Sequence, residues 1–298
     1  MNDIIINEVG PRDGLQSQPT VLSPQQRGGL IQALFAAGLT NIEIGSFVSP
    51  IAVPQMAATD ALAQALQVPM GAEVSALIPN MKGYELARQS GVDVVAVVVS
   101  VTETMNEKNI RMSLSQVMEV AEDIITRGSR EGAQVQAYLA VAFECPFEGL
   151  VDPDRVVDLA ARLMAAGARE LVVADTIGAA NPKQVRSLME RLVDNHGAPR
   201  LACHFHDTRA LGLANVYAAL EAGVRRFDAA VGGLGGCPFA PGTKGNVATE
   251  DVVMLCEQLG YRTGVDIDRL LTVVEMVAQL LDSELGGRAF GWLKQRAA

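Results

Sequence analysis

Short runs of apolar, often β-branched residues alternate with longer stretches rich in Ala, Leu and Gln along most of the chain. The short runs have the length and composition of buried strands, and the longer stretches suit the helices that connect parallel strands. Strands are predicted at residues 4–9, 41–47, 72–77, 92–100, 134–142, 170–175, 201–206 and 226–231. Helices are predicted near residues 24–37, 56–66, 82–90, 113–130, 153–166, 182–194, 209–222 and 249–260.

Eight strand–helix units follow one another in 298 residues, and no low-complexity linker separates them. This pattern favours the α/β class in the form of a closed (β/α)8 TIM barrel, with an open doubly wound sheet as the alternative. Residues 264–298 are predicted to add one or two helices, which would close one end of the barrel or extend a subunit contact. We therefore expect residues 1–298 to form a single catalytic domain.

Polar residues gather directly after the predicted strands. Because chemistry in such a barrel takes place at the carboxyl ends of the strands and in the loops that follow them, this distribution predicts one site drawn from most of the ring. The residues concerned are Glu8, Arg12, Asp13, Glu43, Ser46, Asn80, Glu144, Cys145, Asp175, Thr176, His204, His206 and Asp207, together with the stretch 237–246.

Composition narrows the class of protein further. Hydrophobic residues make up 49% of the chain, yet no uninterrupted apolar run reaches the roughly 18 residues of a membrane span. A net charge of −10 argues against binding to nucleic acid or to an anionic membrane. The first residues lack the pattern of a secretory signal, so a cytoplasmic protein is expected. The four cysteines form no C-x-x-C pair, which predicts reduced thiols.

Two of the three histidines lie two positions apart, in the sequence C-H-F-H-D of residues 203–207. Side chains with this spacing on a strand point to the same face. Two neutral imidazoles, a carboxylate from Asp13 and an amide oxygen from Asn246 would suit Mg²⁺, Mn²⁺, Zn²⁺ or Co²⁺. Asp13 is the natural carboxylate because only the eighth strand separates the first strand from the seventh. Alternatively, His204 and His206 only form hydrogen bonds across the barrel mouth.

A glycine-rich stretch at residues 232–246 is predicted to form a shaped lid. Its glycines permit positive φ and close approach to a ligand, while its prolines restrict the backbone. Cys237, at its centre, has a thiol whose ordinary pKa of about 8.5 is suited to proton exchange. The alternative is that Cys237 is a small buried residue under a tight turn. Lys244 would contact an anionic substrate or, as we favour, remain a solvated loop charge.

Five ordered stretches resemble the 3-hydroxy-3-methylglutaryl-CoA lyases, and the resemblance runs from about residue 3 to 262. They are N-E-V-G-P-R-D-G-L-Q at 7–16, I-E-I-G-S-F-V-S-P at 42–50, A-D-T-I-G at 174–178, H-F-H-D-T at 204–208 and G-G-C-P-F-A-P-G-T-K-G-N-V-A-T-E-D at 235–251. These enzymes belong to a wider group of metal-dependent TIM-barrel lyases and Claisen-type synthases, within which the G-G-C-P loop is specific to the lyase branch. The resemblance implies a carbon–carbon lyase, usually with Mg²⁺ or Mn²⁺, that cleaves 3-hydroxy-3-methylglutaryl-CoA into acetyl-CoA and acetoacetate.

The resemblance also implies roles for individual residues. As metal ligands it implies Asp13, His204, His206 and Asn246. As catalytic residues it implies Arg12, which polarises the thioester, and Cys237, the thiol of proton transfer, with Asp13, His204, Glu43 and Asp175. As substrate contacts it implies Arg12, Gln16, Ser46 and Thr176. A homodimer is expected by analogy, and the residues leave open which group removes the proton of the substrate hydroxyl.

Several positions depart from the family pattern. Where the lyases have D-T-Y-G-Q-A-L-A-N, residues 207–215 read D-T-R-A-L-G-L-A-N, and Gln136 stands where they have Arg. Further departures lie at Glu144, Val172 and Lys244. Citramalyl-CoA and longer-branched hydroxyglutaryl-CoA thioesters are therefore alternative substrates. A Claisen-type synthase or aldolase is disfavoured by the G-G-C-P loop, and a non-catalytic acyl-CoA sensor by the presence of Arg12 and Cys237.

Overall fold

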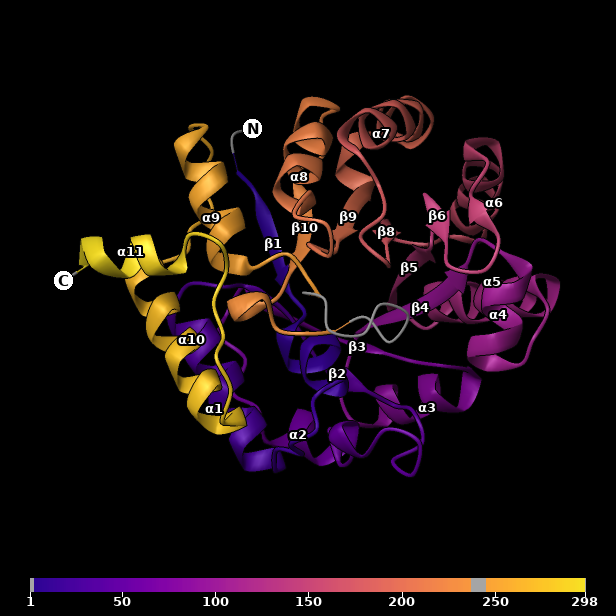
Figure 1. Cartoon of the computed structure of the whole chain (residues 1–298). Helices are drawn as coiled ribbons and strands as arrows, with labels where there is room; N and C mark the ends of the chain where they lie inside the picture. Colours follow the sequence, from indigo (N-terminus) through magenta and orange to yellow (C-terminus); the bar gives the residue numbers. More distant parts are fainter. Residues whose placement is uncertain (1–2, 237–244, 298) are drawn as a thin grey trace.

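The computed structural model describes residues 3–236 and 245–297, and its eight parallel strands close into a barrel (Figure 1). The order around the ring is β1-β10-β9-β8-β5-β4-β3-β2, so β1 pairs with β2 on one side and with β10 on the other. The closed (β/α)8 barrel is thus confirmed over the open sheet. The barrel strands are β1 (Ile5–Glu8), β2 (Asn41–Ser46), β3 (Glu73–Leu77), β4 (Val94–Ser100), β5 (Gln134–Ala140), β8 (Glu170–Asp175), β9 (Leu201–Phe205) and β10 (Arg226–Ala229).

The eight predicted helices surround the barrel, and local capping explains where several of them begin. Ser23 and Ser113 each form a capping box with a glutamine three residues later, and Asn181 does the same before α7. The helices are α1 (Pro24–Ala36), α2 (Thr59–Ala65), α3 (Met81–Gln89), α5 (Leu114–Arg130), α6 (Pro153–Ala166), α7 (Pro182–His196), α8 (Gly212–Glu221) and α9 (Thr249–Gln258).

The structure also contains short elements that the hydrophobic pattern does not predict. Helix α4 (Glu103–Ile110) is largely polar and buries only Met105 and Asn106, so it carries no apolar stripe to reveal it. The remaining short elements are the π-helical turn η1 (Gly10–Gly14), the 3₁₀ turns η2 (Pro54–Met56), η3 (Ala198–Arg200) and η4 (Val231–Gly233), and the hairpin strands β6 (Glu144–Cys145) and β7 (Gly149–Leu150).

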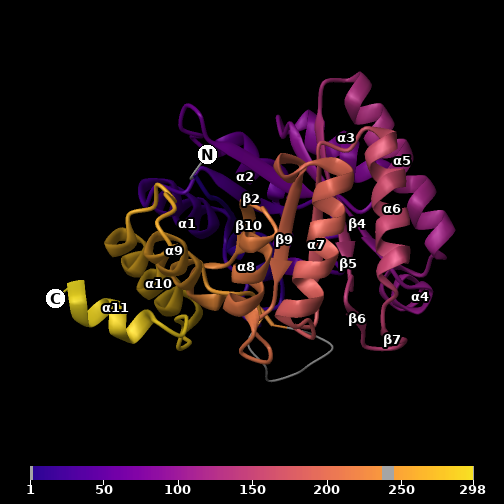
Figure 2. The same ribbon diagram turned by 90° about the horizontal axis from the view of Figure 1, so that it is seen from above.

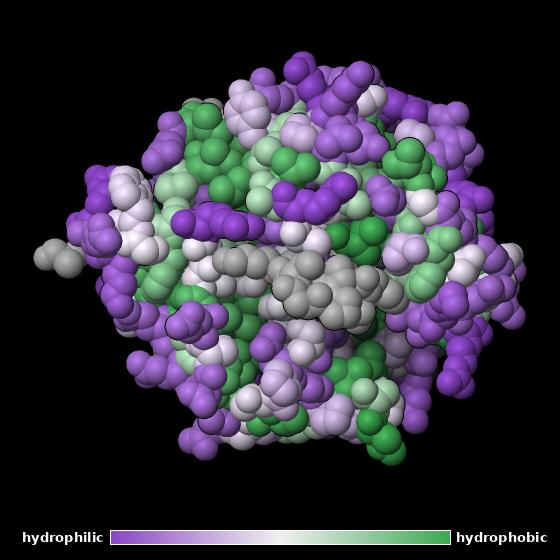
Figure 3. All heavy atoms as spheres, in the orientation of Figure 1, coloured by the Kyte–Doolittle hydropathy of each residue, from purple (hydrophilic) through white to green (hydrophobic). Residues whose placement is uncertain are grey.

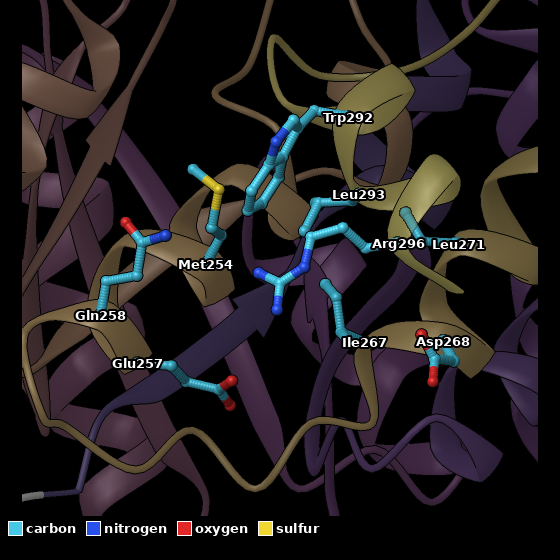
Figure 4. Close-up of a pocket in the computed structure, with 9 residues that line it drawn as sticks. All are labelled: Met254, Glu257, Gln258, Ile267, Asp268, Leu271, Trp292, Leu293 and Arg296. Atoms are coloured by element: carbon cyan, nitrogen blue, oxygen red, sulfur yellow. The ribbon is translucent and has the colours of Figure 1, made fainter. Parts of the chain in front are cut away.

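The expected C-terminal helices are α10 (Ile267–Leu281) and α11 (Phe290–Ala297). Helix α10 packs against both α1 and α9, so it completes the outer layer between the first and last units of the barrel (Figure 2). Helix α11 packs on α10, and a cavity of about 410 Å³ lies beneath it. Trp292 and Arg296 of α11 line this cavity together with Met254 and Glu257 of α9 (Figure 4).

The apolar core is divided between the inside of the barrel and the layer between strands and helices. Inside the ring, Ala96, Tyr138, Val172 and Ala202 form a small buried cluster. Hydrophilic side chains dominate the periphery of the face shown in Figure 3, and hydrophobic ones appear between them in separate patches. Among the described residues, none of the helices has the length and apolar character needed to cross a membrane.

Candidate active site

A cavity of about 520 Å³ lies at the carboxyl ends of the barrel strands, where the sequence predicts the site. Arg12, Asp13, His204 and His206 line one part of it, and aliphatic side chains line the rest. Two other cavities, of about 410 and 420 Å³, lie on the outer helical layer. Among the described residues, Asp13, His204 and His206 form the cluster that could hold a metal ion. These three residues line the cavity of about 520 Å³ at the ends of the strands.

Asp13, His204 and His206 bring three possible metal-ligand atoms within 4.8 Å of one another. His204 lies near the end of strand β9, and His206 follows the strand in a single β-bridge. Their Nε2 atoms are 3.1 Å apart. Asp13 reaches them from η1, where the N–H groups of Arg12, Asp13 and Gly14 all donate to the carbonyl of Val9. The tight turn after β1 thus directs a carboxylate across the barrel mouth.

The surroundings of Asp13 and His206 favour the protonation states in which these two residues can bind a cation. Burial alone would raise the pKa of the Asp13 carboxyl, but the positive charges of Arg12 and the nearby histidines outweigh it and lower the pKa to about 2. Burial, aided by His204, lowers the pKa of His206 to about 4. At neutral pH, Asp13 is therefore a carboxylate and His206 a neutral imidazole.

Asn246 joins the cluster from the segment that follows the glycine-rich loop. Its Nδ2 donates to Oδ2 of Asp13 at 2.8 Å, and its backbone forms an antiparallel bridge with His206. On either side of it, Asp207 N–H donates to the carbonyl of Gly245, and Val247 N–H donates to that of Phe205. The segment is therefore held directly beside the end of β9.

The donor set fits a divalent cation. It combines two imidazole nitrogens, a carboxylate and an amide, a mixture of nitrogen and oxygen donors that Mg²⁺, Mn²⁺ and related ions accept. His206 Nδ1 is buried and has no hydrogen-bond partner among the described residues. No hydrogen-bond donor at Nδ1 therefore fixes the ring proton on Nε2, and Nε2 can act as a metal ligand. These residues could therefore hold a divalent metal.

Arg12 is fixed between two carboxylates at the edge of the cluster. Its Nε lies 2.6 Å from Oε2 of Glu43, and its Nη1 lies 2.7 Å from Oδ1 of Asp13. Burial would lower the pKa of the Arg12 guanidinium, but Glu43 and Asp13 more than compensate and hold it above its ordinary value. Burial raises the pKa of Glu43 to about 7 in spite of Arg12. Arg12 thus presents a permanent positive charge to the cavity.

The other predicted site residues lie around this centre in different ways. Gln16 lines the cavity and donates to Asp13 at 3.0 Å. Thr176 also lines it, and its hydroxyl accepts the N–H of Val141 at 2.8 Å. Ser46 is buried at the end of β2, and its hydroxyl has no hydrogen-bond partner among the described residues.

Asp175 is buried at the end of β8, and its carboxylate accepts the backbone N–H groups of Ala179 and Ala180 at 2.8 and 3.1 Å. Burial raises its pKa to about 6, although these two hydrogen bonds lower it in part. In the structure this carboxylate therefore shapes the loop between β8 and α7. Arg209, one of the departures from the family pattern, donates from its Nε to the carbonyl of Gly178 in the same loop.

Cys237 and Lys244 lie outside the described residues. Gly236, which precedes the cysteine in sequence, lines the cavity. Glu8 holds the residues on both sides of the glycine-rich stretch, because it accepts the N–H of Val231 at 2.9 Å and the hydroxyl of Thr249 at 2.6 Å.

Asp228 and Tyr138 are part of the site environment that the sequence analysis missed. Oδ2 of Asp228 lies 3.0 Å from Nδ1 of His204 and accepts the hydroxyl of Tyr138 at 2.8 Å. Its other oxygen accepts the amide of Asn7 at 2.9 Å. The sequence did contain one signal for this role. Asp228 is an acidic residue inside the otherwise apolar strand that follows Arg226, and a buried carboxylate needs hydrogen-bond or charged partners.

Comparisons with known proteins agree with this geometry. The HMGL-like family model matches residues 3–277. Hydroxymethylglutaryl-CoA lyase of Pseudomonas mevalonii is 42% identical over 281 residues, covering 94% of this chain and 93% of that protein. (R)-citramalyl-CoA lyase of Chloroflexus aurantiacus is 39% identical, with coverage of 96% and 93%. The 3-hydroxy-3-isohexenylglutaryl-CoA/hydroxy-methylglutaryl-CoA lyase of Pseudomonas aeruginosa is 40% identical, with coverage of 95% and 94%.

Solved structures of related lyases have the same fold. Hydroxymethylglutaryl-CoA lyase from Pseudomonas aeruginosa superposes with a TM-score of 0.96 at 38% identity, covering 99% of this chain and 98% of that one. An HMG-CoA lyase from Acinetobacter baumannii, in complex with coenzyme A and 3-methylmalate, gives a TM-score of 0.92 at 37% identity, covering 97% and 94%. From the family model, the relatives and the shared barrel, we conclude that this chain belongs to the HMGL-like family of hydroxymethylglutaryl-CoA lyases.

Proposed function

We propose that this protein is a divalent-metal-dependent lyase that cleaves 3-hydroxy-3-methylglutaryl-CoA into acetyl-CoA and acetoacetate. The observation that carries the proposal is the juxtaposition of Arg12 with the cluster of Asp13, His204 and His206 in one cavity. The relatives of this chain that are named as hydroxymethylglutaryl-CoA lyases support the same reaction, with identities of up to 42%.

This cleavage needs two kinds of assistance. The tertiary hydroxyl of the substrate must lose its proton, and the electrons of the breaking carbon–carbon bond must be accepted by the thioester as an enolate. Asp13, His204, His206 and Asn246 would hold the metal, with Mg²⁺ or Mn²⁺ as the preferred ion. When bound, such a cation supplies Lewis acidity that makes the hydroxyl more acidic.

Arg12 is the residue placed to assist the thioester. Its guanidinium is already oriented by Glu43 and Asp13, so no reorganisation is needed when negative charge develops on the thioester oxygen. Gln16 and Thr176 line the same cavity and would contact the acyl group. Ser46 and Asp175 would support the walls of the site from the ends of β2 and β8.

Cys237 would protonate the enolate carbon after the bond breaks. A thiol suits this step because its ordinary pKa, about 8.5, lies close to neutrality. The position of Gly236 in the cavity wall brings the chain to the site just before the cysteine. Protonation by the protein, in place of bulk water, would complete the release of acetyl-CoA.

The test is to incubate the purified protein with Mg²⁺ or Mn²⁺ and 3-hydroxy-3-methylglutaryl-CoA and to measure acetyl-CoA and acetoacetate. We expect both products at enzyme rates, on the order of 1–10³ s⁻¹. An excess of EDTA should abolish turnover, and added metal should restore it. Turnover that persists after complete removal of metal would contradict the metal-dependent mechanism.

Citramalyl-CoA is the second candidate substrate. The Chloroflexus aurantiacus relative named for it is 39% identical to this chain, almost as similar as the Pseudomonas mevalonii enzyme. Cleavage of citramalyl-CoA also leaves a thioester enolate, so Arg12 and the metal-ligand cluster would serve either reaction. Parallel assays with the two thioesters decide between these substrates. Preferential cleavage of citramalyl-CoA would support the same mechanism but would assign a different substrate to the protein.

Three further predictions belong to this proposal. The whole chain acts as one catalytic domain, it forms a homodimer, and it works in the cytoplasm on an acyl-CoA without nucleic acid or membrane partners. Light scattering coupled to size-exclusion chromatography would test the dimer, and a mass of one chain would contradict it.

A further inference from the structure

Arg27 of α1 is a buried cation that the proposed mechanism does not use. Only 1% of its surface is exposed, and no carboxylate among the described residues forms an ion pair with it. Burial lowers the pKa of its guanidinium from the ordinary 12.5 to about 10. Because a buried charge without an opposite charge is unfavourable, the groups that Arg27 contacts should explain its presence.

The guanidinium of Arg27 joins α1 to two other segments. Its Nη2 donates to the carbonyl of Ile44 in β2 at 3.0 Å and to the hydroxyl of Thr59 at 3.2 Å. Its Nη1 donates to the carbonyl of Ala57, in the turn before α2, at 3.0 Å. Helix α2 packs against both α1 and β2 (Figure 1). Arg27 therefore lies where these three elements meet.

The contact with β2 falls on an irregularity of that strand. Glu43 and Gly45 are two positions apart in β2, yet they pair with consecutive residues of β3. Ile44 between them is an extra residue in the ladder, which is a β-bulge. Bulges redirect the side chains that follow them and are common beside active sites. Arg27 thus donates to the carbonyl of the bulged residue itself.

The bulge determines which side chains of β2 face the site. In a regular strand, Glu43 and Gly45 would share one face and Ser46 would take the other. In the structure, Glu43 and Ser46 pair with residues of β3 that are two positions apart, so they share a face. This is the face on which Glu43 contacts Arg12 at 2.6 Å.

Gly45 lies against the guanidinium and leaves room for it. A Cβ atom at this position would lie 2.6 Å from both Nη2 of Arg27 and the hydroxyl oxygen of Thr59. The place that Arg27 occupies therefore requires a glycine next to the bulged residue. The bulge and the guanidinium fit each other.

Building on the proposed lyase function, we propose that Arg27 is a positioning residue for the reaction. It holds the carbonyl of Ile44 and so fixes the bulge that lets Glu43 reach Arg12 and turns Ser46 to the site. Arg27 is not among the residues that line the active-site cavity. Its effect on turnover is therefore exerted through Glu43 and Arg12.

The first measurement is the steady-state kinetics of Arg27→Met with 3-hydroxy-3-methylglutaryl-CoA and Mg²⁺. Methionine occupies much of the same space but donates no hydrogen bonds. We expect kcat to fall by about tenfold or more with little change in KM, because Arg12 acts on charge that develops in the transition state. Arg27→Lys keeps the charge without the planar fork and should give an intermediate kcat. Arg186→Met, at an exposed position of α7, is the matched control and should keep the parental kcat.

A double-mutant cycle distinguishes positioning from a general effect on the fold. If Arg27 acts through Arg12, the kcat of Arg12→Lys should change by no more than about twofold when Arg27→Met is added. Effects of the two substitutions that multiply in full would overturn the proposal. An unchanged kcat in the single variant Arg27→Met would overturn it as well.

A crystal structure of Arg27→Met gives a result that does not depend on turnover. We expect the bulge at Ile44 to shift and the contact between Glu43 and Arg12 to be lost. A structure in which both are retained would overturn the role of Arg27, even if the parent protein proves not to be a lyase. Absence of cleavage by the parent contradicts the proposed lyase function alone. If Arg27→Met does not fold, Arg27→Lys serves for the kinetic cycle and the crystal structure.

Discussion

Oδ2 of Asp228 lies 3.0 Å from Nδ1 of His204, on the side of the ring that faces away from His206. A carboxylate at this position holds the proton on Nδ1 and leaves a lone pair on Nε2, the nitrogen that faces the rest of the cluster. Tyr138 and Asn7 each donate to Asp228, so the carboxylate is itself fixed in place. The orientation of one candidate metal ligand thus depends on three residues that are not ligands.

Asp228→Asn is therefore expected to weaken metal binding about 10- to 100-fold. The amide can still occupy the same space, but it no longer carries the negative charge that orients the imidazole of His204. Electron paramagnetic resonance of free Mn²⁺ would measure the affinity without any assay of turnover. Asp158→Asn, at an exposed position of α6, is the control, and an unchanged Mn²⁺ affinity in Asp228→Asn would contradict the assigned role.

Arg12→Lys is expected to lower kcat by about 10²–10³-fold, the usual effect of removing one donor to a developing oxyanion. Lysine retains the charge but cannot contact Glu43 and the thioester through separate guanidinium nitrogens. Steady-state kinetics with 3-hydroxy-3-methylglutaryl-CoA would measure the loss. Arg127→Lys, in a surface ion pair on α5, should behave like the unaltered protein, and turnover of Arg12→Lys within a few-fold of it would remove Arg12 from the reaction.

Cys237→Ala should reduce turnover by about 10²–10⁴-fold, because it removes a positioned proton donor. Affinity for the substrate should change little, since the thiol acts only after the carbon–carbon bond breaks. Cys256→Ala is a suitable control because Cys256 is buried in α9, outside the residues that line the active-site cavity. Equal turnover in Cys237→Ala and the parent would show that another group delivers the proton.

Glu8→Gln should change the pH dependence of stability. Burial raises the pKa of Glu8 from its ordinary 4.5 to about 7, although hydrogen bonds from Thr249, Val231 and Gly10 lower it in part. Between these two pH values the unfolded chain releases the Glu8 proton before the folded protein does. The free energy of unfolding therefore falls as pH rises from about 4.5 to 7, by roughly 1–3 kcal/mol from this group.

Glutamine resembles the protonated form of Glu8. In the variant, the free energy of unfolding should therefore fall less as pH rises from about 4.5 to 7. Urea unfolding at pH 5, 6, 7 and 8, with EDTA present, would show it as a shallower slope for Glu8→Gln. Glu119→Gln changes an exposed residue of α5 in the same way and should keep the parental slope. A slope in Glu8→Gln that is as steep as in the parent, or steeper, would contradict the role assigned to the Glu8 carboxyl.

The barrel itself was predictable from the sequence because its strands and helices have different apolar periods and alternate regularly. The predicted bounds of β8 and α6, for example, match the structure, since both elements are bordered by clear capping or turn residues. Helix α4 was missed because it lacks an apolar stripe. The juxtaposition of Asp13 with His204 followed from the order of strands in a closed ring.

Other aspects of the site required three-dimensional packing. The link between Asp228 and His204 depends on which strands are neighbours and on their register, where Asp228 pairs with His204 across β10 and β9.

The hydrogen bond between Asn246 and Asp13 joins residues 233 positions apart, since the barrel closes by pairing its first strand with its last. During synthesis, Asp13 leaves the ribosome long before either histidine or Asn246 exists. A nascent chain that ends before β9 therefore holds only one member of the metal-ligand cluster. The four residues that would hold a cation therefore come together only after nearly the whole polypeptide has been translated and the ring has closed.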